Sequence, residues 1–467
     1  MTSRTGQLAD FAANLALADI PADVRESIKL HLLDTIGCGL AGASSDLARR
    51  VLNSVEGEHA RGPCPVLGTA TSLAPAGAAF ANAAAMNALD HDDGFEVDGK
   101  GMGHPGATLV AAALSGAAQA GSDGATLLTA LAAAYEINGR VILSMQPSYG
   151  RFRQVYGVCQ HQALGAAAAY GRLLGLNGAQ MANAFGFAGT LAPVPSLRKY
   201  NWQARPLVSF KDFNAPAAEA GVRAVQFERA GLTGAADVLD GENGFWRMMG
   251  SDQFDPALLS DGLGDSWWAR HASFKPYPTC RWMHTALESF EGVRTDRPLA
   301  PDAIEAIEVL TSAGLARDFM EVAPRTLVDA QFSLPFALAS LALGRPKARW
   351  YADISSSDTA RAALAARVWV RKDDEIDAQM SGETRRPAGQ VRVMAFGRWF
   401  EGPRLIYPLG CLERPMAPEA VVAKFRANAA CALSADAVER IEAAVLDLEH
   451  QSDVSALLAL SAGRPPS

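Results

Sequence analysis

Residues 104–143 read "HPGATLVAAALSGAAQAGSDGATLLTALAAAYEINGRVIL", and this stretch decides the fold class. Large apolar residues recur among alanines on both sides of the segment Gly121–Gly124. The pattern predicts two antiparallel helices joined by a short turn, with Ser122 or Asp123 as the N-cap of the second helix. Small residues let helix backbones approach closely, so the alanine stripes indicate packing and not catalysis. Residues 161–190 repeat the same hairpin pattern.

The flanking segments separate into a helical part and a mixed part. Residues 21–42 place Val24, Ile28, Leu32 and Ile36 four positions apart, which predicts a helix that starts near Pro21. After residue 268 the composition changes, and the β-branched segments 303–312, 366–377 and 389–402 predict strands. Segments 332–344 and 356–365 lie between them and favour helices, and the chain becomes helical again from residue 417.

This order predicts a mainly α protein with a large, discontinuous all-helical domain. Residues 1–269 and 406–467 would form that domain from both ends of the chain, and residues 270–405 would form a smaller inserted α+β domain. A chain of 467 residues that is 49% hydrophobic can bury the cores of two or three domains.

Charge and composition restrict the partners and the location of the protein. The formal net charge of -8 is spread along the chain, which argues against nucleic-acid binding because that function needs a clustered basic face. The first 24 residues lack the apolar stretch of a signal peptide, and no uninterrupted run of about 18 apolar residues indicates a membrane span. The six cysteines are scattered without CxxC spacing, so we expect reduced thiols and a cytoplasmic location.

Acidic, imidazole and glycine residues interrupt the helical pattern in "LDHDDGFEVDGKGMGHPGA", residues 89–107. His104 precedes a proline that is well placed to start a helix, and the N-terminal end of a helix favours bound anions. Asp90 ends the preceding helical segment and could face the same pocket, where a carboxylate beside an imidazole is a standard pair for proton transfer. The alternative is a surface loop whose acids cap helices and whose histidine is only polar.

A metal site is a competing interpretation of this loop. Asp90, Asp92, Asp93 and His104 could ligate an ion, and "DDGFE" resembles the magnesium motif of all-helical isoprenoid synthases. That family needs a second acidic motif, and we find no convincing one in this sequence. The motifs HExxH, GxSxG and the Walker lysine loop do not occur either.

Three further segments carry residues suited to chemistry. His161 opens the second alanine-rich hairpin, where a structural histidine is the alternative. Lys211 precedes a Pro-Ala-Ala helix start, where burial beside an imidazole would lower its pKa, although an ordinary ammonium flanking a helix fits equally. The segment 273–284, where the two predicted domains meet, is either a ligand cleft or a basic linker. Its polar residues are Lys275, Tyr277, Arg281 and His284.

Together and in this order, the segments resemble the MmgE/PrpD family, which includes 2-methylcitrate dehydratase, cis-aconitate decarboxylase and iminodisuccinate epimerase. The resemblance covers nearly the whole chain, and the ordered set of anchors is highly specific. The anchors are "LDHDDG" with "GHPGA", "GAAAAYGRLLGLN", "FKDFNAPAAEAGVRAVQFERAGLTGAADVLDGENGF", "FKPYPTCRWMH" and "QFSLPFALASLALG".

The resemblance implies that the inserted α+β domain is a lid, that the protein is a homodimer, and that no metal or organic cofactor is required. It assigns catalytic roles to Asp90, His104, His161, Lys211 and Lys275, with His161 in a segment closer to the methylcitrate dehydratases. Lys211, Lys275, Arg281, Gly94 and Phe336 would contact the substrate. Two of these positions depart from relatives: Gly94 stands where several members have threonine, and Phe336 stands where the decarboxylases have tyrosine.

The reactions of the family share a carbanion-like centre beside a carboxylate, which needs a base and stabilising cations. We expect His104 or His161 to move the proton on carbon, with Asp90 orienting His104. Lys211 and Lys275, with Arg281, would bind carboxylates, and one lysine would protonate a departing hydroxyl.

The sequence therefore predicts a cofactor-independent carbon–oxygen lyase that acts on a small di- or tricarboxylate, similar to 2-methylcitrate dehydratase. An epimerase or isomerase and a cis-aconitate-type decarboxylase are the competing hypotheses for the same pocket. A metal-dependent lyase or hydrolase and a non-catalytic ligand-binding protein are competing hypotheses of a different class.

Overall fold

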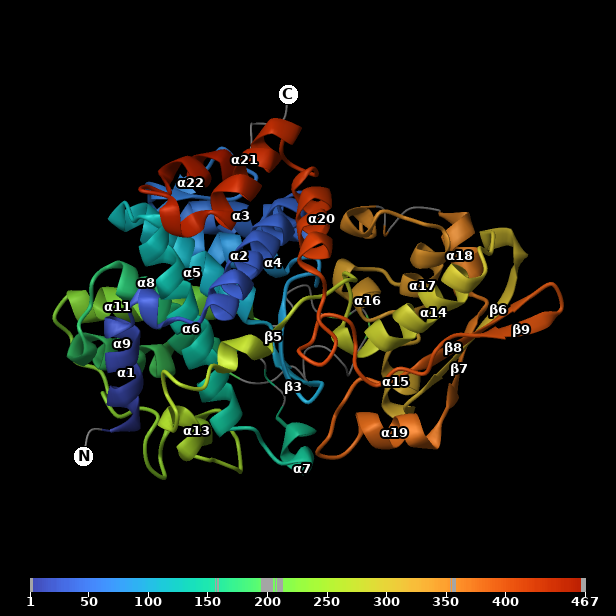
Figure 1. The fold of residues 1–467 in the computed structure, drawn as a ribbon, viewed down its shortest axis with the longest axis horizontal. Helices are drawn as coiled ribbons and strands as arrows, with labels where there is room; N and C mark the ends of the chain where they lie inside the picture. The colour runs from blue at the N-terminus through green and yellow to red at the C-terminus, as the bar shows by residue number, and fades with distance from the viewer. Residues whose placement is uncertain are drawn as a thin grey trace.

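The computed structural model describes residues 3–155, 157, 159–194, 205, 207, 213–352, 354 and 358–462. The described chain is mainly helical and forms a larger helical lobe and a smaller lobe with a β-sheet (Figure 1). None of the described helices combines the length and the apolar character that crossing a membrane requires.

The larger lobe is built from long helices whose facing sides are rich in alanine. The alanines of α5, α6 and α8 are almost all buried, so these helices pack at short distance, as their composition predicts. The N-terminal and central helices are α1 (Arg4–Asn14), α2 (Ala22–Ala43), α3 (Asp46–Glu58), α4 (Pro75–Asn87), α5 (Pro105–Ala120), α6 (Gly124–Ser144), α7 (Tyr149–Phe152), α8 (Gln162–Leu173), α9 (Gly178–Leu191), α11 (Asn214–Arg229), α12 (Phe245–Met248) and α13 (Ala257–Ser260).

The predicted hairpin of residues 104–143 is confirmed. Helix α5 ends at Gly121, whose φ of 62° is the left-handed conformation that glycine adopts without strain. Helix α6 is capped by Asp123, whose carboxylate accepts a hydrogen bond from the Thr126 backbone N–H at 2.7 Å. The second predicted hairpin is also present as α8 and α9.

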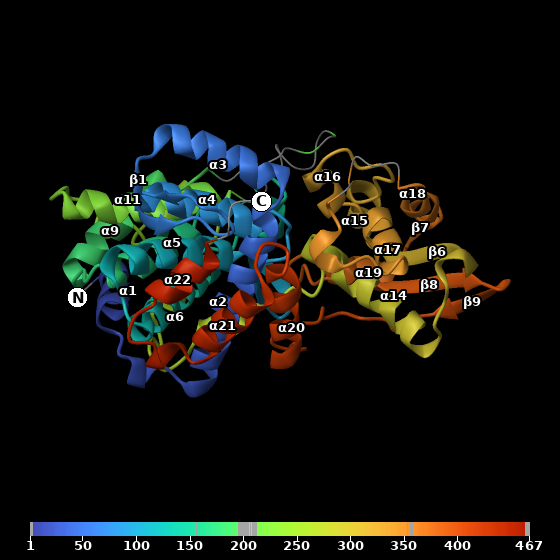
Figure 2. The same ribbon diagram turned by 90° about the horizontal axis from the view of Figure 1, so that it is seen from above.

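The C-terminal helices return to the larger lobe. They are α20 (Pro418–Ala429), α21 (Ala435–Leu446) and α22 (Ser455–Ser461); α20 and α21 pack beside α2, and α22 packs on α21 and α5 (Figures 1 and 2). Phe425 of α20 packs against Gly37 of α2, where an added Cβ would lie 3.0 Å from the phenylalanine ring. The Gly124 N–H at the start of α6 donates to the Gln451 carbonyl at 2.8 Å.

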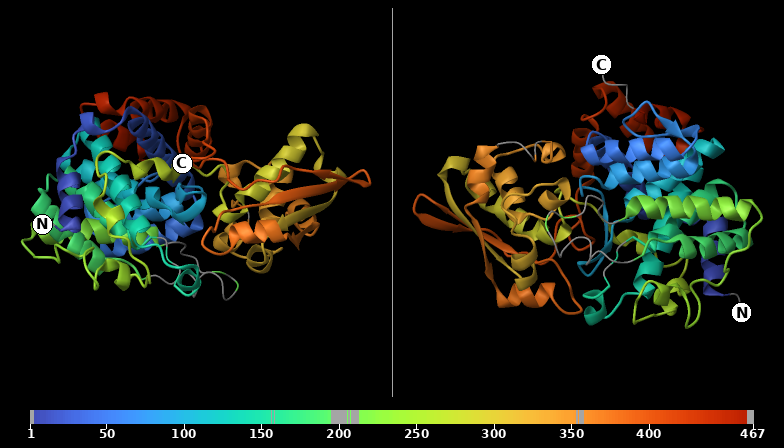
Figure 3. Two further views of the ribbon diagram at one scale, coloured as in Figure 1. Left: turned by 60° about the horizontal axis from the view of Figure 1, so that its bottom comes forward. Right: turned by 180° about the vertical axis from the view of Figure 1, so that it is seen from behind.

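The smaller lobe contains a four-stranded sheet of order β7-β6-β8-β9, in which β6 and β7 are parallel and the remaining pairs are antiparallel. The view from behind shows this sheet on the outer side of the lobe and the helices on the side nearer the larger lobe (Figure 3). The strands are β6 (Ile304–Thr311), β7 (Val368–Lys372), β8 (Gln390–Ala395) and β9 (Arg398–Glu401), and the helices are α14 (His284–Asp296), α15 (Ala313–Asp318), α16 (Leu327–Gln331), α17 (Leu334–Ala342), α18 (Thr359–Ala365) and α19 (Asp374–Met380).

All three predicted strand segments contain strands, with one difference in extent. The segment 366–377 was expected to be a strand throughout, but β7 ends at Lys372 and α19 starts at Asp374. The cause is Asp373, whose carboxylate accepts a hydrogen bond from the Ile376 N–H at 3.1 Å and caps the helix. The predicted helices at 332–344 and 356–365 are present as α17 and α18.

Part of the acidic loop forms a small sheet that the sequence did not predict. Strands β3 (Gly94–Val97) and β4 (Lys100–Gly103) form a hairpin, and β3 also pairs with β5 (Ala272–Ser273). Asp98 and Gly99 both have positive φ at the turn, as a two-residue hairpin with the strand twist requires. Another small sheet pairs β1 (Arg61–Pro65) with β2 (Ser72–Leu73).

The buried apolar residues form two main clusters. One cluster draws on residues 8–272 and 425–458, and the second lies mostly within residues 277–395. Residues of both chain ends therefore share one core. The domain limits proposed above, 1–269 with 406–467 and 270–405, stay a prediction.

Candidate active site

Lys275 and Asp90 form a buried ion pair where the two lobes meet. Both side chains are fully buried, and the Lys275 ammonium contacts the Asp90 carboxylate and donates to the Asp90 carbonyl at 2.9 Å. Asp90 follows α4 and has a φ of 52°, a strained conformation for a residue that is not glycine. The two residues are 185 positions apart in the sequence, so the fold brings together two of the predicted site residues.

His104 caps α5 and is held by the same acidic loop. Its Nδ1 lies 2.8 Å from the Asp93 carbonyl oxygen, which can only accept, so Nδ1 carries the proton and Nε2 carries the lone pair of the neutral ring. The Asp93 carboxylate accepts from the Gly106 N–H at 2.7 Å and from the Tyr135 hydroxyl at 2.8 Å. Asp93 therefore fixes both the ring of His104 and the first turn of α5, whereas the ion pair of Asp90 is with Lys275.

The amide of Asn214 joins the first turns of α5, α8 and α11. Its nitrogen donates to the His104 carbonyl at 2.7 Å and to the side-chain oxygens of Thr108 and Gln162, each at 3.1 Å. Because Gln162 is the first residue of α8, His161 is brought to the same end of the lobe as His104. Three helix N-termini meet here, and each favours a bound anion.

His161 is fully buried, and neither of its ring nitrogens is hydrogen-bonded to another described residue. Burial lowers the pKa of His161 to about 3, so the ring is neutral at physiological pH. A neutral ring can still exchange hydrogen bonds with a ligand, but as a base it is weaker than an ordinary histidine.

A second buried cation was not singled out from the sequence. Lys424 of α20 donates to the Asp34 carboxylate at 2.9 Å and to the His91 carbonyl at 2.5 Å. Burial is the largest single effect and lowers the pKa of Lys424, but the nearby acidic groups, Asp34 foremost, together outweigh burial and raise the pKa above its usual value. In the sequence Lys424 appears within an ordinary amphipathic helix, and no local signal marks it.

Arg281 is bonded to protein in the structure, and its predicted contact with the substrate stays a prediction. Its guanidinium donates to the Glu96 carboxylate at 2.6 and 3.3 Å and to the Leu409 carbonyl at 2.8 Å, and it also contacts His284. Every guanidinium nitrogen is therefore already bonded to protein. Arg281 thereby ties β3 to the segment before α14.

Gly94 and Phe336, the positions that differ from relatives, are both buried. A Cβ on Gly94 would lie 2.7 Å from the Ser273 hydroxyl, so a larger residue at position 94 would displace that hydroxyl. Phe336 stacks on Tyr351 with 5.7 Å between ring centroids, and the Tyr351 hydroxyl donates to the Pro278 carbonyl. Burial raises the pKa of Tyr351, and nearby Asp90 adds to the effect. A hydroxyl thus lies one ring beyond Phe336 and near Asp90, which the sequence did not predict.

Lys211 lies outside the described residues, three positions before Asn214, and its predicted role stays a prediction. Within the described part of the chain, no three His, Cys, Asp or Glu side chains are grouped to hold a metal ion. The acids of the loop face separate partners: Asp90 faces Lys275, Asp92 accepts from Asn87, and Asp93 binds the start of α5.

The structure is that of a mainly helical protein with a smaller, sheet-containing lobe and a buried lysine–carboxylate pair where the two lobes meet. Comparison with known proteins identifies the family. Models of the MmgE/PrpD N-terminal and C-terminal domains match residues 6–257 and 277–450. The chain therefore belongs to the MmgE/PrpD family of enzymes.

Curated relatives resemble the chain over its whole length. A cis-aconitate decarboxylase-like protein of Aspergillus oryzae is 25% identical over 98% of this chain and 97% of its own. The cis-aconitate decarboxylases of Aspergillus terreus and Homo sapiens are each 24% identical, covering 98% and 100% of this chain and 95% and 96% of their own. The homodimer and the cytoplasmic location stay predictions.

Proposed function

We propose that the protein is a cofactor-independent hydro-lyase that eliminates water from a small hydroxy di- or tricarboxylate, similar to 2-methylcitrate dehydratase. The observation that carries this proposal is the buried Lys275–Asp90 pair beside the loop that holds His104. The pair supplies a cation in a site screened from water, and His104 supplies a basic ring nitrogen.

The chemistry assigned to these groups is a proton abstraction followed by loss of water. Nε2 of His104 removes a proton from the carbon next to a carboxylate, and the electron pair forms the new C=C bond as the C–O bond breaks. The departing hydroxyl takes a proton from an acid, for which a lysine ammonium is the proposed group, and leaves as water. Lys211 and Lys275 hold the substrate carboxylates, and the helix N-termini add to the positive potential.

A second candidate is decarboxylation of cis-aconitate, which the names of the curated relatives favour. In that reaction a C–C bond breaks, carbon dioxide leaves, and the carbanion-like centre takes a proton. Identity of about 25% leaves room for a change of reaction, and Phe336 lacks the hydroxyl that the decarboxylases are expected to have there.

The test is to incubate the purified protein with 2-methylcitrate, citrate, cis-aconitate and iminodisuccinate in deuterated water and to follow the products by NMR. A hydro-lyase converts a hydroxy acid into an unsaturated acid, a decarboxylase shortens cis-aconitate, and an epimerase inverts iminodisuccinate as deuterium enters. Binding without any exchange would instead indicate a ligand-binding protein. Loss of turnover in chelator, restored by one ion, would favour the metal-dependent hypothesis.

The matched variants are His104→Ala and His450→Ala. His450 is a surface histidine near the C-terminus, so its replacement controls for loss of an imidazole. We expect His104→Ala to lower turnover by about 10²–10⁴-fold, the usual contribution of a general base, and His450→Ala to leave it unchanged. A folded His104→Ala variant with full turnover would overturn the assignment.

A further inference from the structure

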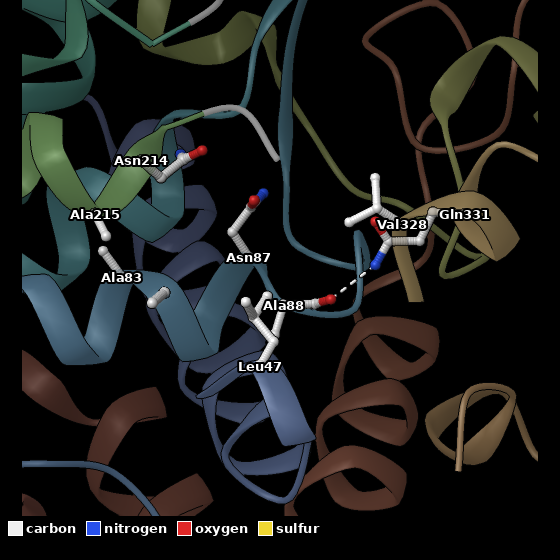
Figure 4. Close-up of a pocket in the computed structure, with 9 residues that line it drawn as sticks. Leu47, Ala83, Asn87, Ala88, Asn214, Ala215, Val328 and Gln331 are labelled. Carbon is white, nitrogen blue, oxygen red and sulfur yellow. Dashed lines mark hydrogen bonds between the residues drawn. The ribbon is translucent and has the colours of Figure 1, made fainter. Parts of the chain in front are cut away.

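A small pocket lies between the end of α4, the start of α11 and the end of α16, at the junction of the lobes. Its polar side chains are the three amides of Asn87, Asn214 and Gln331, and apolar residues such as Leu47 and Val328 complete the wall (Figure 4). The cavity measures about 10 Å³, which is enough for one water-sized group.

Two of these amides have a fixed orientation. The Asn214 nitrogen donates to the His104 carbonyl and the Gln331 nitrogen donates to the Ala88 carbonyl, each at 2.7 Å. A carbonyl only accepts, so turning either amide over would place two acceptors against each other. The side-chain oxygens of Asn214 and Gln331 are therefore the atoms left to bind something else.

Neither oxygen accepts a hydrogen bond from any described residue, although the two side chains are only 1% and 0% exposed. Buried acceptors are nearly always paired in folded proteins, because losing water without replacement is unfavourable. The amide of Asn87 lies between those of Asn214 and Gln331 in Figure 4, and its nitrogen faces the Asp92 carboxylate at 3.2 Å. The pocket thus presents amide oxygens to a small group that donates hydrogen bonds.

We propose that this pocket binds the hydroxyl group of a hydroxy di- or tricarboxylate, which donates its single hydrogen to the Asn214 or the Gln331 oxygen. This inference rests on the proposed function and assigns the residues that recognise the hydroxyl group of its substrate. At neutral pH the carboxylates of such a substrate cannot donate, and the amide oxygens repel them, whereas the hydroxyl can donate. The pocket wall includes Ala88, two residues before Asp90, and Asn214, whose amide holds the backbone carbonyl of His104, so the pocket adjoins the segments that carry both residues.

The pocket discriminates between citrate and tricarballylate, the same tricarboxylate without the hydroxyl. We expect wild-type protein to bind citrate about tenfold more tightly, as one well-formed hydrogen bond at a buried acceptor provides. Isothermal titration calorimetry of both acids measures this ratio without any variant, under conditions in which NMR shows that citrate is not converted. Gln331→Met, which keeps the length of the side chain but removes one of the two acceptors, should lower the ratio while leaving the affinity for tricarballylate unchanged.

The matched control is Asn82→Leu, which removes a buried amide of α4 that is bonded at both ends, to the Leu67 N–H and the Pro65 carbonyl. It should destabilise the fold and preserve the ratio. Equal affinities of the wild-type protein for the two acids would overturn the subsite and leave the proposed function standing, provided that both acids bind. Failure of citrate and 2-methylcitrate alike to bind or react would refute the proposed function and the subsite with it. A ratio that appears only when sodium or potassium is added would assign the oxygens to a cation and overturn the proposal.

Discussion

The Lys275–Asp90 pair allows a quantitative test, because both partners are fully buried and neither can be rehydrated when its counterpart is removed. In Lys275→Met the Asp90 carboxylate loses its ammonium partner, and in Asp90→Asn the ammonium loses its counter-charge. Breaking a buried pair from one side costs about 3–5 kcal/mol of the free energy of unfolding. Lys275→Met also loses the 2.9 Å hydrogen bond to the Asp90 carbonyl, so its cost should be the larger of the two.

The double variant measures how strongly the charges of Lys275 and Asp90 depend on each other. With both charges removed no uncompensated charge remains, so we expect Lys275→Met/Asp90→Asn to cost no more than either single change. Equilibrium unfolding in urea, followed by circular dichroism, gives the three free-energy differences. A control cycle on the ion pair of Arg426 with Glu442, where the arginine side chain is 59% exposed, should yield a coupling of at most about 1 kcal/mol. Additive costs at positions 275 and 90, or single costs below about 1 kcal/mol, would refute the buried-pair interpretation.

Three further perturbations test the rest of the site. Because folding lowers the pKa of His161 from 6.5 to about 3, the free energy of unfolding should fall as the pH drops from about 6.5 towards 3. His161→Gln should reduce the slope of this free energy against pH by up to one proton. An unchanged slope would show that burial does not lower the pKa of His161. Gly94→Thr should destabilise the fold by about 1–3 kcal/mol through contact with the Ser273 hydroxyl. Calorimetric melting should show that Ser273→Gly restores part of this loss. If it restores nothing, the contact with Ser273 is not the cause of the destabilisation. Arg281→Gln should lower the free energy of unfolding by about 3–5 kcal/mol because it leaves the buried Glu96 carboxylate without its cation. A folded variant should bind citrate normally. A large loss of affinity in titration would instead show that Arg281 contacts the substrate.

The sequence predicted features that local periodicity determines. The alanine-rich hairpins, the strand segments and the return of the C-terminal helices all follow from apolar spacing and turn residues, and the family models match most of the chain. The β3–β4 hairpin was missed because its glycines and acids have low strand propensity, and pairing with β5 from a distant part of the chain sustains it. The start of α19 was missed because a capping aspartate directly follows the strand.

The site was predictable in its residue types but not in its pairings. Lys275 and Asp90 were expected in one pocket and do meet, yet Arg281 is bonded to Glu96, a partner 185 positions away that no local pattern reveals. Asn214 shows the same limit: in the sequence it stands at a predicted helix start, and only the fold shows that its amide joins three helices.

The contacts that build the site are also contacts between the lobes. Asp90 and Ala88, at the end of α4, bind Lys275 and Gln331, and β3 of the same loop binds Arg281 through Glu96. A relative movement of the lobes therefore changes three contacts together. These are the ion pair of Lys275, the pocket around Gln331 and the bond between Arg281 and β3. Because one loop carries all three connections, a substitution there acts on stability and on binding at once. A loss of turnover in this loop can be assigned to chemistry only when the unfolding free energy and the affinity for a non-reacting tricarboxylate are both unchanged.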